Sequence, residues 1–363
     1  MKIFIVCSRL SYGGAERVGV MLANGLSVSH SVYLISNTLE EPTYEVESSV
    51  QLLPLFSSIS SKIDKWASTL PNIRKYAKTY QPDVIIGVME TCSLVSKLAT
   101  IGLGIPIIMT EHNAFERPKN TPLTKWQIIT KFYINKLYCC VTILTEADKE
   151  FIGLRLKNTV VMPNPLFLTP IIKSPVKDKI VLAAGRIDDW HCKGFDILLK
   201  AWGTIAKQYP DWTLEIAGDG RKVDLELLQN IVRKSEVENQ VKFLGYQKNI
   251  VDRYKQSAVF VLSSRYEGFG LVLIEAMSQG CACVACDFKG RQREIIRNDS
   301  EGLVCVPNDV DALALAIKKM IDDDMYRQKV QKAAIERSKY YTMDKTIRRW
   351  EKLLKRLLSN NCL

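Results

Sequence analysis

Two glutamates frame a glycine-rich turn in the second half of the chain. Glu267 and Glu275 stand eight residues apart, and Gly268-Phe269-Gly270 lies between them. The apolar run Ala258–Leu262 precedes the turn and an apolar helical pattern follows it, which places the turn at the carboxyl end of a strand. A single glutamate is usually a solvated surface charge. Two carboxylates around such a turn are good acceptors for hydroxyl groups, and they predict a site for a sugar or a ribose.

Basic residues beside glycines follow one further predicted strand and open the helix after it. Gly185-Arg186 follows Ile180–Ala184, and Lys193-Gly194 opens the next helical segment. A planar guanidinium and a compact ammonium at one sheet edge are suited to a diphosphate. The alternative is two solvated cations, but the position after a strand favours binding. Gly218-Asp219-Gly220 repeats this arrangement after Thr213–Ala217.

A glycine pair, Gly13-Gly14, lies between the predicted strand Lys2–Cys7 and the predicted helix Ala15–Leu26. It would let the backbone approach an anion at the helix N-terminus. The complete G-x-G-x-x-G pattern of dinucleotide sites is absent, so a nicotinamide cofactor is not favoured. A simple tight turn explains the pair equally well at this stage.

Of the three histidines, His112 has the position that suits a functional group. It follows the predicted strand Pro106–Thr110 in Thr110-Glu111-His112-Asn113, where a side chain would reach a cleft between domains. A lone histidine is more often structural. His30 and His191 lie in surface turns or loops, and we expect neither to be catalytic.

The elements that must position these residues alternate between short apolar runs and longer amphipathic segments. This rhythm is typical of parallel sheets with helices on both faces, and it predicts an α/β protein with two Rossmann-like domains. The rhythm stops once, in a stretch rich in proline and lysine. The expected parts are a first domain over 1–165, a linker over 166–179, a second domain over 180–342, and a C-terminal helix in 343–363 that crosses back to the first domain.

The composition excludes disordered and fibrous proteins. The chain has 363 residues, 47% hydrophobic and 25% charged, which is ordinary for a globular protein and long enough for two domains. Lys and Arg number 50 against 39 Asp and Glu, a net charge of +11. Such a balance suits nucleic acid, an anionic membrane surface or a phosphorylated small molecule. No signal peptide is evident at the start, and the apolar runs are too short to span a membrane.

The ten cysteines indicate a reducing compartment rather than a disulfide framework, because most lie in apolar stretches. Cys281-x-Cys283-x-x-Cys286 has the spacing of metal ligands, but no histidine or second cysteine pair accompanies it. We interpret it as part of a buried strand. No metal site and no cofactor are expected.

Taken in order, these motifs resemble a retaining glycosyltransferase of family 4 with the GT-B fold, of the type that acts in bacterial surface-polysaccharide synthesis. The resemblance covers nearly the whole chain, and its motifs are specific as a set. They are Gly13-Gly14-Ala15-Glu16-Arg17, Glu111-His112-Asn113, Asn164-Pro165, Gly185-Arg186, Lys193-Gly194-Phe195-Asp196, Gly218-Asp219-Gly220, the pair Glu267 and Glu275, Gly302-Leu303-Val304 and Pro307-Asn308-Asp309.

The resemblance implies a role for each matched residue. Arg186 and Lys193 would neutralise the donor diphosphate, Glu275 would hold the ribose, and His112 would lie against the donor sugar near the reacting carbon. Glu267 and the N–H groups of the following turn would contact the sugar and the diphosphate. No metal would be required. The implied donor-binding set is Gly14, Gly185, Arg186, Lys193, Gly218, Glu267, Gly268, Phe269, Gly270, Leu271 and Glu275, and the implied catalytic set is Glu267, Arg186, Lys193 and His112.

Two basic stretches in the first half favour a peripheral position on the inner face of the cell membrane. No acidic residue occurs from Arg117 to Thr145, where cations alternate with aromatic and aliphatic residues. The cations are Arg117, Lys119, Lys125, Lys131 and Lys136, and their neighbours are Trp126, Ile128, Ile129, Phe132, Tyr133 and Leu137. The second set is Lys62, Lys65, Arg74, Lys75 and Lys78, with Trp66. The alternative is ordinary amphipathic helices that bury their apolar faces in the core.

The resemblance favours a UDP-hexose or UDP-N-acetylhexosamine donor and a saccharide acceptor, linked to a lipid diphosphate, for capsule, O-antigen or exopolysaccharide. A GDP-mannose-dependent mannosyltransferase is the alternative within the same fold. A non-catalytic nucleic-acid-binding protein is a remote alternative that the charge alone permits. The glutamates and Arg186 disfavour it, so no nucleic-acid partner is expected.

Overall fold

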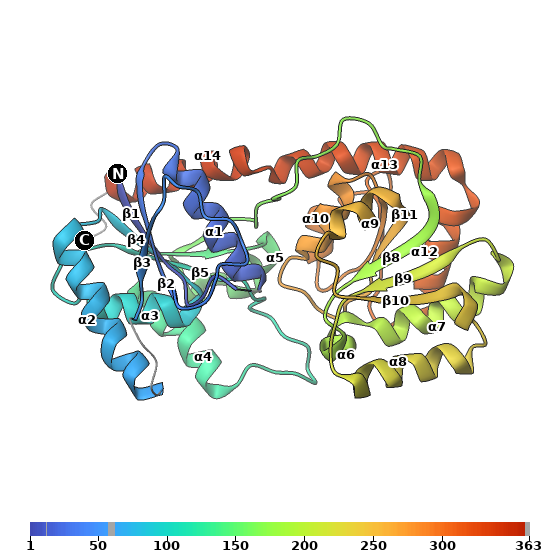
Figure 1. Cartoon of the computed structure of the whole chain (residues 1–363), viewed down its shortest axis with the longest axis horizontal. Helices are drawn as coiled ribbons and strands as arrows, with labels where there is room; N and C mark the ends of the chain where they lie inside the picture. The colour runs from blue at the N-terminus through green and yellow to red at the C-terminus, as the bar shows by residue number, and fades with distance from the viewer. Residues whose placement is uncertain (12, 57–61, 360–363) are drawn as a thin grey trace. The chain divides into compact units, whose positions relative to one another are not determined.

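The computed structural model describes residues 1–11, 13–56 and 62–359, and it leaves out the side chains of residues 62–67. Lys62, Lys65 and Trp66 of the second basic stretch therefore lie outside the described side chains. The chain divides into two compact units. The first is Met1–Pro165 with Met343–Leu363, and the second is Leu166–Thr342 (Figure 1).

The first unit is built on a seven-stranded sheet in which every pairing is parallel. The strand order is β3-β2-β1-β4-β5-β6-β7. The strands are β1 (Lys2–Val6), β2 (Ser31–Ser36), β3 (Gln51–Pro54), β4 (Val84–Val88), β5 (Ile107–Thr110), β6 (Cys140–Ile143) and β7 (Thr159–Val161). Ile3 and Ile5 enter the core on one face, while Phe4 and Val6 enter the core on the other. Burial on both faces explains why these strands are continuous apolar runs.

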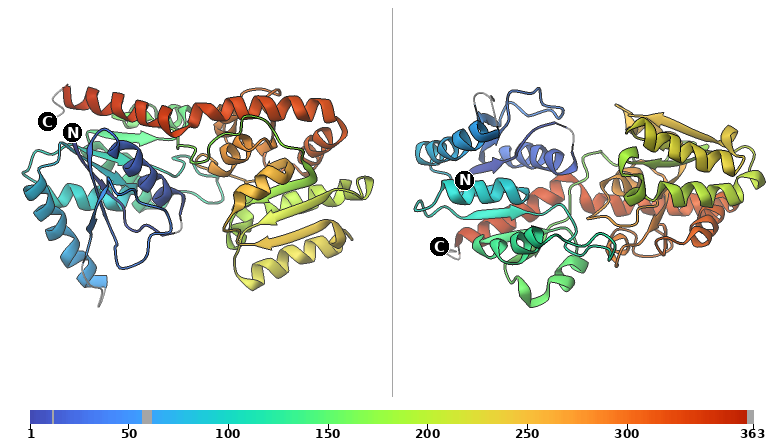
Figure 2. Two further views of the ribbon diagram at one scale, coloured as in Figure 1. Left: turned by 45° about the horizontal axis from the view of Figure 1, so that its top comes forward. Right: turned by 90° about the horizontal axis from the view of Figure 1, so that it is seen from below.

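Helices cover both faces of this sheet. One face carries α1 (Gly14–Ser27) and α14 (Met343–Ser359), whose Trp350, Leu353 and Leu354 pack beside Leu22 and Leu26. Figures 1 and 2 show α14 beside α1. The other face carries α2 (Lys62–Tyr80), α3 (Met89–Ala99), α4 (Lys125–Phe132) and α5 (Glu146–Ile152).

The second unit has a six-stranded parallel sheet in the order β10-β9-β8-β11-β12-β13. The strands are β8 (Asp178–Ala184), β9 (Thr213–Ala217), β10 (Val241–Gly245), β11 (Ser257–Leu262), β12 (Ala282–Cys286) and β13 (Leu303–Cys305). The helices are α6 (Trp190–Lys193), α7 (Phe195–Ile205), α8 (Lys222–Lys234), α9 (Ile250–Gln256), α10 (Leu271–Ser278), α11 (Arg291–Ile295), α12 (Val310–Asp322) and α13 (Asp324–Ser338). The two sheets confirm the predicted α/β class with two Rossmann-like domains.

The segment predicted as a linker, 166–179, is fixed to the second unit. The Lys177 ammonium donates to the carbonyls of Tyr254 and Gln279 at 2.9 and 2.7 Å. The N–H of Ile171 donates to the carbonyl of Ser278 at 3.0 Å. Burial lowers the pKa of Lys177, while the carbonyls of Tyr254, in the last turn of α9, and of Gln279, at the end of α10, accept from its ammonium.

The cysteine run is a buried strand, as predicted. Cys281, Cys283 and Cys286 are buried, and burial raises the pKa of Cys281 to about 11, which keeps its thiol protonated. All nine described cysteines are free. No described helix combines the length and the apolar character needed to cross a bilayer.

Candidate active site

Glu267 is the centre of a charged cluster in the second unit. Its Oε1 accepts hydrogen bonds from Lys193 Nζ at 2.7 Å and from Ser264 Oγ at 2.8 Å. The Lys193 and Glu267 side chains are only 22% and 15% exposed, so their attraction is weakly screened. Burial alone would lower the pKa of Lys193, but Glu267 outweighs it and the pKa is raised. Lys193 therefore carries its positive charge at neutral pH, and its partial exposure lets a ligand approach it.

Residues just after β11 and at the start of α7 position Lys193. Ser263, just after β11, donates from Oγ to the carbonyl of Lys193 at 2.8 Å. Arg265 forms a two-pronged ion pair with Asp196 of α7, with distances of 2.7 and 2.8 Å. Gly194, which links Lys193 to α7, has a φ of +65°. A Cβ there would lie 2.0 Å from the Ser263 carbonyl oxygen. Only glycine fits this turn, which is why α7 begins at Phe195 rather than at the predicted Gly194.

Gly185 brings the end of β8 against Lys193, and Gly218 brings the end of β9 against Gly185. A Cβ on Gly218 would lie 1.7 Å from the Gly185 carbonyl oxygen, so the two turns pack backbone to backbone. The stem of Lys193 lies against Gly185, with its Cδ 3.2 Å from the place a Cβ would occupy. The structure thus brings together the predicted residues Gly185, Gly218, Lys193 and Glu267 at the carboxyl edge of the sheet.

Arg186 has a different environment from Lys193. Its side chain is 73% exposed, and its Nε lies 3.1 Å from Asp188 Oδ1. Among the contacts of the described residues, Lys193 and not Arg186 pairs with Glu267.

The turn between the two glutamates leads directly into α10. Gly270 is the N-cap of this helix in a left-handed conformation, and Leu271 is its first residue. The free N–H groups of the first turn of a helix favour an anion. Gly268 precedes Phe269, which is buried and meets Tyr341 edge-on at 5.5 Å between ring centres. Tyr341 therefore supports the turn from behind.

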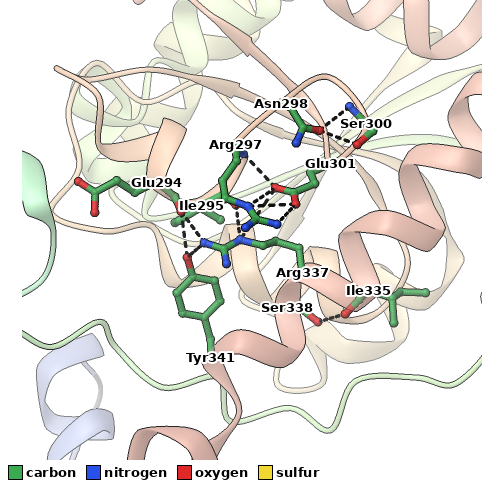
Figure 3. Close-up of polar contacts among 10 residues, drawn as sticks. All are labelled: Glu294, Ile295, Arg297, Asn298, Ser300, Glu301, Ile335, Arg337, Ser338 and Tyr341. Atoms are coloured by element: carbon green, nitrogen blue, oxygen red, sulfur yellow. Dashed lines mark hydrogen bonds and ion pairs between the residues drawn. The ribbon is translucent and has the colours of Figure 1, made fainter. Parts of the chain in front are cut away.

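A polar network holds Tyr341 in place (Figure 3). Arg337 at the end of α13 donates to the hydroxyl oxygen of Tyr341 at 2.8 Å and to the carbonyl of Glu294 at 2.6 Å. The Tyr341 hydroxyl itself donates to the Glu294 carbonyl at 3.2 Å. Glu301 pairs with Arg297 and lies 3.9 Å from Arg337. The glycine turn thus rests on a ring whose position is set by several bonds.

Glu275 is buried in α10 and is 4% exposed. The hydroxyl of Tyr254, itself fully buried in α9, donates to Glu275 Oε2 at 3.1 Å. The sequence interpretation named Glu275 but missed Tyr254. A periodicity argument assigns a tyrosine in a short helix to the core and does not predict its hydroxyl partner.

His112 lies in the first unit, just after β5, where both ring nitrogens have partners. Nε2 is 3.0 Å from Thr110 Oγ1, and Nδ1 is 3.1 Å from Asn164 Oδ1. Burial lowers the pKa of His112, so the ring is neutral at neutral pH. A proton on Nδ1 donated to Asn164 fits this geometry. Asn164 belonged to a predicted motif, and the structure now gives it a contact with His112.

A carboxylate of the same unit lies against the glycine pair Gly13-Gly14. Gly14 starts α1, and the Glu16 carboxylate lies where a Cβ on Gly13 would be, 2.0 Å away. Glu16 Oε1 accepts from Arg9 Nε at 3.2 Å. An anionic ligand that approached Gly13 would meet the negative charge of this carboxylate.

The basic stretch of the first unit requires a correction. Lys131 and Phe132, predicted to belong to a membrane-facing surface, are both buried. Lys131 pairs with Glu111, 20 residues earlier in the chain. The outward side of this region does carry exposed apolar residues, namely Trp126, Ile128, Ile129, Tyr133 and Leu137. Helix α4 is therefore amphipathic, but it buries Lys131 and Phe132, which were predicted to face the membrane.

Comparison with known proteins identifies the fold and the family of this chain. The solved structure of Anabaena Alr3699/HepE in complex with UDP and glucose superimposes with a TM-score of 0.77 at 19% identity, covering 98% of this chain and 99% of that one. The fold is that of the GT-B glycosyltransferases. Residues 12–166 match the model of Glycosyltransferase Family 4, and residues 168–337 match that of glycosyl transferases group 1. The chain belongs to the glycosyltransferases built from these two domains.

Two bacterial relatives are similar over their whole length. One is the N-acetyl-D-galactosaminyltransferase of Campylobacter jejuni that acts on a GalNAc-GalNAc-diNAcBac-PP-undecaprenol, 28% identical over 98% of each chain. The other is the amylovoran biosynthesis glycosyltransferase AmsD of Erwinia amylovora, 29% identical over 97% of this chain and 99% of the relative.

Proposed function

We propose that this glycosyltransferase acts in bacterial surface-polysaccharide synthesis. It transfers a hexose or N-acetylhexosamine from a UDP-sugar to a saccharide carried on a lipid diphosphate, with retention of configuration. The observation that carries the proposal is the Lys193–Glu267 pair at 2.7 Å beside Gly185 and the N-terminus of α10. The amylovoran and undecaprenol-linked relatives support the pathway and the acceptor class.

The donor diphosphate meets three sources of positive potential in the second unit. They are the Lys193 ammonium, the N–H groups after Gly270 and the exposed guanidinium of Arg186. When Lys193 turns to the diphosphate, Glu267 is released to accept hydrogen bonds from the sugar hydroxyls. Glu275, held by Tyr254, accepts from the ribose. We propose that these groups make a metal ion unnecessary, because they stabilise the leaving diphosphate directly.

The proposed chemical step breaks the bond between the anomeric carbon and the diphosphate oxygen, and it forms a bond to the acceptor hydroxyl on the same face. The acceptor proton passes to the departing phosphate oxygen. His112, neutral because burial lowers its pKa, would contact the donor sugar as a hydrogen-bonding group rather than as a cation. This role and the retention of configuration follow from the family resemblance.

We further propose that the outward side of α4 contacts an anionic membrane surface. Trp126 and Tyr133 are 60% and 64% exposed; Lys125 precedes Trp126 in the sequence, and Lys136 Nζ lies 5.5 Å from the ring centre of Tyr133. Co-sedimentation with vesicles containing phosphatidylglycerol should exceed that with neutral vesicles, and Trp126→Ser should weaken it. Equal sedimentation with both vesicles would contradict this part of the proposal.

A panel of nucleotide sugars with a lipid-diphosphate saccharide acceptor tests the function. UDP release that depends on the acceptor is expected, and Glu267→Ala and Glu275→Ala should abolish it without unfolding the protein. Wild-type rates in both variants would reject the site. GDP-mannose belongs in the panel, since a mannosyltransferase is the alternative. Thermal stabilisation by an oligonucleotide, but by neither UDP nor GDP, would instead favour the remote nucleic-acid alternative.

A further inference from the structure

Helix α4 carries a charged residue into the interior of the first unit. The side chains of Lys131 and Glu111 are 3% and 2% exposed, and they form an ion pair. The Lys131 ammonium also lies 4.4 Å from the ring centre of Phe115. Lysine and glutamate are almost never buried so completely unless they are paired.

Glu111 uses its two carboxylate oxygens for different partners. Oε1 accepts the backbone N–H of His112 at 3.0 Å and that of Asn113 at 2.8 Å. Oε2 accepts from Lys131 Nζ. The carboxylate thus closes the turn that carries His112, and Lys131 fixes the carboxylate. A change in the position of Lys131 would reach His112 through a single side chain.

Stability alone does not explain this pair. Taking two charges out of water costs about as much as their attraction returns, and a well-packed apolar pair often serves the fold equally well. What a buried pair does supply is orientation, because the charge-assisted bonds fix the carboxylate in one geometry. The orientation fixed here is that of the backbone on either side of the His112 side chain.

We infer that Lys131 is a positioning residue for His112: it holds Glu111, which holds the His112 turn. The inference rests on the proposed function, in which His112 contacts the donor sugar. Its consequence is that Lys131 governs the rate of sugar transfer without taking part in nucleotide binding, since the residues proposed to bind the diphosphate and the ribose belong to the second unit. It also connects α4, the helix with the exposed apolar side, to the reacting groups.

The test uses the full-length protein with ¹⁵N-labelled histidine. The three histidines give few imidazole signals, and His112→Gln assigns the relevant one. Lys131→Met keeps the length of the side chain and removes the charge. Lys149→Met on α5 is the matched control, because Lys149 is exposed and lies outside the proposed site. If Lys131→Met does not fold, the double variant Lys131→Met/Glu111→Gln replaces it. The double variant leaves neither charge of this buried pair, and its amide oxygen accepts weaker bonds than a carboxylate does.

In the folded variant we expect the His112 imidazole signals to shift or broaden and kcat to fall about tenfold or more, since small displacements at a reacting centre cost up to about 100-fold. The KM for the donor and the affinity for UDP should stay within about twofold of wild type, and Lys149→Met should match wild type throughout. Unchanged His112 signals with unchanged kcat would overturn the inference, as would a change confined to thermal stability. If the wild type transfers no sugar, the proposed function has failed, and the His112 signals still decide whether Lys131 positions the turn.

Discussion

Replacing Tyr254 with Phe removes one hydroxyl from behind Glu275 and changes little else. The ring is fully buried, and it also packs edge-on against Phe260 at 5.7 Å, a contact that phenylalanine keeps. The hydroxyl donates to Glu275 Oε2 at 3.1 Å. The substitution therefore isolates the hydrogen bond that orients the carboxylate proposed to bind the ribose.

The magnitude follows from the carboxylate form in which Glu275 is proposed to accept a hydrogen bond from the ribose. A hydrogen bond to an ionised group contributes about 1.5–3 kcal/mol. Expressed wholly in binding, this would weaken UDP affinity about 10- to 150-fold, because each 1.4 kcal/mol is a factor of about ten. Part of the loss will appear as lower stability, since a buried carboxylate oxygen loses a donor. We expect UDP affinity about tenfold weaker and a lower free energy of unfolding.

Isothermal titration with UDP and chemical denaturation measure the two effects separately. Tyr209→Phe is the matched control, because its hydroxyl donates to Asp322 at 2.6 Å in a solvent-exposed position. That variant should change the unfolding free energy by about 0.5 kcal/mol at most and should bind UDP normally. If Tyr254→Phe bound UDP as the wild type does, then Tyr254 would not orient Glu275 or Glu275 would not meet the nucleotide. Normal UDP binding by Tyr254→Phe would therefore refute the reasoning.

Two further predictions concern stability. Gly218→Ala should lower the free energy of unfolding by at least about 3 kcal/mol, because the new Cβ would lie 1.7 Å from the Gly185 carbonyl oxygen, whereas Gly245→Ala, with open space around it, should cost about 1 kcal/mol; similar denaturation midpoints would contradict this. Burial, and then Glu111, raises the pKa of Glu90 above its ordinary 4.5, so the folded protein holds this proton more tightly than the unfolded chain, and stability falls as pH rises through the folded pKa. Glu90→Gln should therefore raise the melting temperature at pH 8 and leave it unchanged near pH 4.5, and a lower melting temperature at pH 8 would show that the charged form is favourable.

The sheets could be predicted from the sequence because their strands are buried on both faces. Thr213–Ala217 and the helix Leu271–Ser278 begin and end where the apolar pattern places them. β3 was missed for the complementary reason. It is a short edge strand with Gln51 and Leu52 exposed, and its Pro54 is a residue that sequence patterns assign to edges and turns.

The candidate site could be predicted only in its local part. Glycines and charged residues directly after strands are visible along the chain, and the structure does gather Gly185, Gly218, Lys193 and Glu267. Their supporting partners are remote in sequence. Tyr254 comes from a short helix that has no pattern of its own.

The error at Lys131 has the same origin. In an acid-free stretch, a lysine looks like part of a solvated surface. Its partner Glu111 lies in another element, and only the packing of α4 against the sheet brings the two charges together. Whether a charged side chain of a helix is buried or exposed depends on such distant partners.

The most direct measurement of the proposed activity follows the anomeric proton signals of donor and product by NMR in one reaction. The reaction contains the protein, a UDP-hexose or UDP-N-acetylhexosamine with an α-anomeric bond, and a lipid-diphosphate saccharide acceptor. The account predicts that the donor signal decays in step with UDP formation while a new α-linked signal grows. A β-linked product would contradict retention, and a donor signal that persists for every sugar nucleotide would contradict the proposed donor.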